Sequence, residues 1–108
     1  MTRDLYFRVD IAKKYGPNEA ILLHEFVRLT QQNKAEGRNF AKDRYWVCVS
    51  IKELAAMYPF WSVAQIKRLT KKLCEEGLIL VDNFNVDPMD RRNWYSPSNR
   101  TKAIYETC

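Results

Sequence analysis

Four basic side chains lie close together in the stretch from Ser62 to Cys74, which contains no acidic residue. They are Lys67, Arg68, Lys71 and Lys72. Lysine and arginine bind anions, above all nucleic-acid phosphates, and their gathering on one element is what a nucleic-acid-binding surface requires. The net charge of the 108-residue chain is only +5, so this clustering says more than the total charge does.

Residues that could support catalysis or hold a metal are not grouped in this way. His24 is the one histidine, and its place opposite Leu22 on a predicted helix indicates a solvated surface side chain. Cys48, Cys74 and Cys108 match no zinc, redox or disulfide spacing; the first two fit small core residues and the third a frayed end. We therefore expect no enzymatic activity, no metal and no cofactor.

A capped helix carries the basic cluster. Ser62 precedes Gln65 by three positions, which is the spacing of a capping box, and Trp61 before the cap can pack on Ile66 as a hydrophobic staple. The pattern predicts a helix over 62–76, with Gly77 in the left-handed position after its end.

The two faces of this helix differ in character. At 100° per residue one face is apolar or weakly polar and predicted to be buried; it consists of Ile66, Leu69, Thr70 and Leu73, with Val63 at its edge. Arg68, Lys71 and the small Ala64 point the opposite way, with Lys72 and Gln65 to one side. Basic residues on an exposed helix face often only solvate it, but such a surface usually mixes signs of charge.

A second capped helix precedes the basic one. Ser50 and Glu53 form another capping box, with Val49 and Leu54 as its staple, and Pro59 ends the helix. Two capped helices joined by a short turn form a helix-turn-helix.

A β-hairpin is predicted directly after the helix pair. Residues 78–85 and 93–96 have strand character, and Asp87-Pro88 marks the turn between them, with Arg91 and Arg92 near its tip. In the position that follows a helix-turn-helix, such a hairpin is the wing of a winged helix. The predicted fold class is therefore mainly α with a small β-hairpin (α+β), a winged helix-turn-helix over residues 1–97.

The rest of the chain reads as support for this unit. A helical turn should end at Gly16-Pro17. A long helix should then run from about Asn18, its predicted N-cap, to Ala35. Residues 38–44 should form a loop, followed by a strand over residues 45–49. Residues 98–108 are either a tail or a short helix capped by Ser98. No apolar run is long enough for a membrane span, and the charged N-terminus does not resemble a signal peptide, so we expect a cytoplasmic protein without a membrane partner.

The stretch "YPFWSVAQIKRLTKKLCEEGLI", followed by "NFN" and "DRRNWYS", resembles the N-terminal winged-helix domain of phage replisome organisers and DnaD-like replication initiation proteins. The likeness is strongest over residues 50–96. The matching positions are Pro59, Phe60, Trp61, Ser62, Ile66, Lys67, Arg68, Gly77, Leu78, Asn83, Phe84, Asn85, Asp90, Arg91, Trp94 and Tyr95. The resemblance implies a DNA-binding domain used when a phage or mobile element begins replication. Relatives usually carry a second, helical domain, for which 108 residues leave no room.

Double-stranded DNA is accordingly the first predicted partner, with helix 62–76 in the major groove and the wing, residues 78–96, on the backbone. Gln65 and Arg68 are the candidates for reading base edges, and the other basic residues and Ser62 for phosphate contacts. The full predicted set is Ser62, Gln65, Lys67, Arg68, Lys71, Lys72, Arg91 and Arg92. One short helix reads few base pairs, so useful specificity would call for a homodimer or an array.

A protein–protein module is the alternative. Winged helices are also used for assembly, and the basic helix could then meet an acidic surface on a replication or defence protein of the host. Both functions predict salt-sensitive binding, so binding to plain duplex DNA is the observation that separates them.

Overall fold

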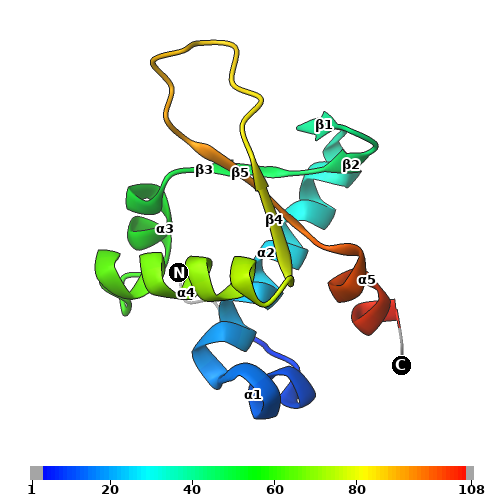
Figure 1. Ribbon diagram of the computed structural model, residues 1–108, viewed down its shortest axis with the longest axis vertical. Coiled ribbons are helices and arrows are strands. Elements are labelled where there is room, and N and C mark those ends of the chain that lie inside the picture. Colours follow the sequence, from blue (N-terminus) through cyan, green and yellow to red (C-terminus); the bar gives the residue numbers. More distant parts are fainter. Residues whose placement is uncertain (1–3, 107–108) are drawn as a thin grey trace.

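The computed structural model describes residues 4–106, which form five helices and two small antiparallel sheets (Figure 1). This confirms the α+β class. The elements are α1 (Val9–Tyr15), α2 (Pro17–Glu36), β1 (Phe40–Ala41), β2 (Arg44–Tyr45), β3 (Val47–Val49), α3 (Ile51–Met57), α4 (Val63–Glu75), β4 (Ile79–Asp82), β5 (Asn93–Pro97) and α5 (Asn99–Glu106). In this part of the chain, no helix has both the length and the apolar character that crossing a bilayer requires.

The long helix α2 lies at the centre of the core. Its predicted span was close, but Asn18 is not the N-cap: the helix begins at Pro17, after Gly16, because proline fits the first helical position. Its buried residues include Leu22, Leu23, Phe26 and Val27, and the helix contacts both α4 and the strands β2, β3 and β5. Phe26 is fully buried and stacks on Tyr95 of β5 with ring centroids 5.1 Å apart.

Both predicted capping boxes are present. Ser50 Oγ accepts from the Glu53 amide, and Ser62 Oγ accepts from the Gln65 amide, with both reciprocal side-chain bonds formed. The end of α4 is a Schellman motif, since Leu78 N donates to Leu73 O and Gly77, at φ 72°, donates to Cys74 O. Local sequence therefore fixes where α3 and α4 begin and where α4 ends.

The larger sheet has the strand order β3-β5-β4. β4 and β5 form the predicted hairpin, in register Val81 opposite Tyr95, and β3 pairs antiparallel with the other edge of β5. On β5 the Tyr95 side chain is buried, while that of its neighbour Trp94 is only partly buried. The connection over residues 83–92, which we call the hairpin loop, projects away from the helices (Figure 1).

A second hairpin occupies the region predicted to be a loop. β1 and β2 pair across a two-residue turn formed by Lys42 and Asp43, both at positive φ (49° and 59°). The pairing was missed because such turns usually contain glycine or asparagine, and here neither is present. Trp46 Nε1 donates to Ala41 O over 2.8 Å, which ties this hairpin to the start of β3.

Residues 99–106 form the helix α5, so the short-helix alternative was right. Ser98 Oγ caps it through the Thr101 amide and also donates to Gly77 O at the end of α4. Tyr105 covers His24, whose Nδ1 lies 2.9 Å from the tyrosine hydroxyl. The expected solvated histidine was therefore wrong, and burial lowers the pKa of His24.

Candidate nucleic-acid interface

The outer face of α4 is a single exposed stripe. Ala64, Lys67, Arg68, Lys71 and Glu75 recur at helical spacing and are all exposed, while the opposite face is buried as predicted. Within residues 4–106, the side chains of the three basic residues of this stripe have neither a hydrogen-bond nor an ion-pair partner on the protein. Their charges are therefore available to an external anion.

Lys72 differs from its neighbour Lys71. Its Nζ lies 2.8 Å from Glu19 Oε2 and donates to Tyr15 O over 2.8 Å, so it bridges α4 to the junction between α1 and α2. The predicted role of Lys72 as a phosphate contact would require breaking this ion pair. In the structure Lys72 instead holds α4 in place.

Ser62 and Gln65 both form hydrogen bonds in the N-terminal capping box of α4. Gln65 Oε1 accepts from Ser62 N over 2.8 Å, and Ser62 Oγ accepts from Gln65 N over 3.1 Å. Gln65 was predicted to read a base edge. A two-point contact with adenine would need both its side-chain oxygen and its nitrogen, so such a contact competes with the cap. The Ser62 hydroxyl proton stays available to donate to a phosphate, because its oxygen acts as the acceptor.

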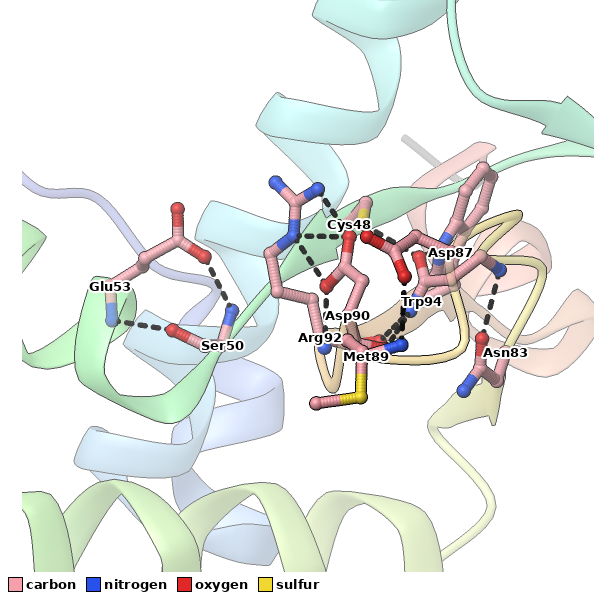
Figure 2. Close-up of polar contacts among 10 residues, drawn as sticks. Cys48, Ser50, Glu53, Asn83, Asp87, Met89, Asp90, Arg92 and Trp94 are labelled. Carbon is pink, nitrogen blue, oxygen red and sulfur yellow. Dashed lines mark hydrogen bonds and ion pairs between the residues drawn. The ribbon is translucent and has the colours of Figure 1, made fainter.

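The two arginines predicted at the wing tip have different surroundings. Arg91 is exposed and has no partner among the described residues. Arg92 forms a two-point ion pair with Asp90, with Nη2–Oδ2 at 2.6 Å and Nε–Oδ1 at 3.0 Å. Hydrogen bonds from Arg92 lower the pKa of Asp90 to about 2. This pair faces the start of α3, where Ser50 and Glu53 form their cap (Figure 2).

The hairpin loop is held in shape by Asn85, which the sequence did not single out as a structural residue. Its Nδ2 donates to Asp90 O and Arg92 O, and its Oδ1 accepts from Trp94 Nε1 over 2.7 Å. Asn83, Asp87 and Asp90 add short turns by accepting from backbone amides within the loop (Figure 2). These bonds fix the direction in which the loop extends.

An aromatic cluster anchors the base of the same loop. The Phe84 ring packs edge-on against Trp46 and Trp94, with centroids 5.1 and 5.3 Å away. Lys42 lies over the Phe84 ring and pairs with Asp82, which joins the β1–β2 hairpin to the loop. The tip itself carries apolar side chains, with Val86 fully exposed and Met89 78% exposed.

Other features of the described chain limit what the site can do. Residues 4–106 contain no cluster of three or more histidine, cysteine or acidic side chains that could hold a metal. Burial raises the pKa of the Cys48 and Cys74 thiols, which makes them poor nucleophiles, and Cys108 lies outside the described residues. Lys52, in the first turn of α3, is a further exposed basic residue that the sequence analysis did not select.

Among known proteins, no family model, no curated sequence and no solved structure was found to match this chain. The resemblance to replisome organisers and DnaD-like proteins therefore stays a prediction carried by its motifs.

Proposed function

We propose that this chain is a winged-helix module that binds double-stranded DNA, with α4 in the major groove and the β4–β5 hairpin as the wing on the backbone. The observation that carries the proposal is the row of three unpartnered cations, Lys67, Arg68 and Lys71, on the exposed face of α4. Lys72, Lys42 and Arg92 are paired with carboxylates, whereas these three cations lie together on one helix face without such a partner.

The dimensions of α4 suit a groove. An α-helix with its side chains is about 10–12 Å across, comparable to the width of the major groove of about 12 Å. Ala64 leaves room for close approach at the N-terminal end, where the helix dipole also favours phosphate. Glu75 and Glu76 at the other end would repel the backbone, so the N-terminal half of α4 should enter the groove.

The order of the elements supports the same arrangement. Helices α3 and α4 are joined by a short turn, a hairpin follows directly, and a third strand, β3, precedes the pair and completes the sheet. Arg68 is the candidate for reading a guanine edge, and Lys67, Lys71 and Arg91 are the candidates for phosphate contacts. The family-level expectation, a role in initiating replication of a phage or mobile element, is part of the proposal and rests on the motifs alone.

The salt dependence of binding follows from the number of free cations. If the three on α4 and Arg91 each neutralise one phosphate, the slope of log K against log salt should be about −3.6. Raising the salt from about 50 mM to about 200 mM would then weaken binding roughly 150-fold. If Lys72 and Arg92 also took part, the slope would be about −5.4.

Fluorescence anisotropy with a labelled duplex of about 30 base pairs tests the proposal. Arg68→Glu/Lys71→Glu should abolish binding at about 50 mM salt, because two phosphate contacts become repulsive. Lys13→Glu/Lys14→Glu makes the same charge change on the exposed side of α1 and serves as the control. Absence of wild-type binding at low salt, or equal loss in both variants, would contradict DNA recognition by α4.

A protein partner is the second candidate, and the exposed apolar tip of the hairpin loop favours it. Val86 and Met89 lie on either side of Asp87, whose carboxylate would repel phosphate. Wild-type protein that does not bind duplex DNA would make this candidate the leading one.

A further inference from the structure

A cavity of about 360 Å³ lies between α2, the β1–β2 hairpin and α5. None of its lining residues belongs to α4 or to the hairpin loop, so it is separate from the proposed DNA-binding face. Its volume falls within the range of small-ligand sites, about 300–1,000 Å³.

Three cations from three different elements line this cavity: Lys34 of α2, Arg44 of β2 and Lys102 of α5. Within residues 4–106, none of them forms an ion pair with a carboxylate. Arg44 is held in place by neutral acceptors, with Nη1–Pro97 O at 2.9 Å and Nη2–Asn99 Oδ1 at 3.0 Å. It is therefore fixed in position while keeping its full charge.

The positive charges of Lys34 and Arg44 affect the ionisation of Lys102. The pKa of Lys102 is lowered, first by burial and then by the positive charges of Arg44 and Lys34, while Glu106 opposes the shift. Asp43 and Glu106 also line the cavity and are exposed, as is Lys34, whereas Arg44 and Lys102 are half-buried. The interior is thus more positive than its rim, and an anion that entered would relieve the repulsion among the three cations.

The same elements also bring aromatic side chains to the cavity. Phe40, Tyr45 and Tyr105 all face the cavity, and the Phe40 ring lies 4.9 Å from that of Tyr45 while remaining 57% exposed. Exposed aromatic rings next to fixed cations are the combination that binds a planar ring attached to a phosphate.

We propose that this cavity binds a nucleoside monophosphate, with its phosphate among Lys34, Arg44 and Lys102 and its base against Phe40 and Tyr45. The site does not depend on DNA binding by α4. Because its cations come from three elements, an anion would tie α5 and the β1–β2 hairpin to α2.

Isothermal titration calorimetry with adenosine 5′-monophosphate, adenosine and inorganic phosphate tests this site. Adenosine monophosphate should bind more tightly than either of its parts, because only it contacts both the cations and the rings. Lys34→Gln/Lys102→Gln should weaken its binding at least about tenfold, since two charge-assisted contacts are lost. Lys67→Gln/Lys71→Gln removes the same charge from α4 and should bind the nucleotide like wild type.

Three results would overturn the proposal. Wild type that does not bind the nucleotide at millimolar concentration shows that there is no site. If the two double variants bind the nucleotide equally well, binding reflects the overall positive charge of the protein and not this cavity. Phosphate that binds as well as the nucleotide shows that the rings take no part. Circular dichroism and a thermal melt of each variant separate loss of the site from loss of the fold.

Discussion

The adjacent residues Lys71 and Lys72 should respond in opposite ways to the same substitution. Lys71 is exposed and unpartnered among residues 4–106, whereas Lys72 donates to both Glu19 Oε2 and Tyr15 O over 2.8 Å. Lys71→Gln should leave stability within about 0.5 kcal/mol of wild type and make the salt slope of DNA binding shallower by about 0.9. Lys72→Gln should leave the slope unchanged and destabilise the fold.

The cost of Lys72→Gln can be worked from its contacts. Two charge-assisted hydrogen bonds contribute about 1.5–3 kcal/mol each when buried. The Lys72 side chain is 43% exposed and that of Glu19 only 14%, so water screens part of the interaction. A loss of about 1–2 kcal/mol is expected, which for a domain of this size lowers Tm by roughly 5–10 °C.

Thermal melts and anisotropy at several salt concentrations measure both quantities on the same preparations. Glu19→Gln breaks the pair from the other side and is the matched control: it should lower Tm similarly without making the slope shallower, since the charge of Lys72 remains. The reasoning is refuted if Lys72→Gln keeps the wild-type Tm and makes the slope as shallow as Lys71→Gln does. Lys72 would then face DNA rather than Glu19.

Two further predictions concern stability. Burial holds the pKa of His24 below its ordinary value of 6.5 in the folded protein. As the pH falls, His24 of the unfolded chain therefore takes up a proton at a higher pH than His24 of the folded chain does. Stability should fall as the pH drops below about 6.5. Melts at about pH 7.5 and about pH 5.5 should show this fall, and His24→Asn should reduce it. Gly16→Ala should cost about 1–3 kcal/mol in chemical denaturation, because φ is 115° and ψ 152° and the added Cβ would lie 2.5 Å from Glu19 Oε1. Gly37→Ala, with φ 67° and no atom within 4 Å of the added Cβ, should cost only about 1 kcal/mol; equal losses would contradict the argument from Glu19.

Features governed by nearby residues were the ones that could be predicted. The capping boxes at Ser50 and Ser62 need only a three-residue spacing, and the glycine at the end of α4 needs only its position, so α3 and α4 were placed closely. The buried stripe of α4 followed from its period alone.

Features that depend on distant or unusual contacts were missed. The partner of Lys72 lies 53 residues away, so no local pattern indicates that this lysine is paired while Lys71 is not. The contact of His24 with Tyr105 was not predicted, since α5 was only one of two alternatives for the end of the chain. The Asp90–Arg92 ion pair is a different case: its two residues are only two positions apart in the sequence, so the pair could have been predicted.

The strand order β3-β5-β4 also has a consequence for how the chain folds as it is made. The central strand is the last of the three to be synthesised, so neither β3 nor β4 has a hydrogen-bonding partner until residues 93–97 are available. Helices α1 to α4 can form from local contacts before that point. A nascent or truncated chain that stops short of Asn93 would therefore expose two unpaired strands, the state most prone to aggregate. Assembly of the three-stranded sheet, and with it of the β4–β5 hairpin, therefore has to wait for β5.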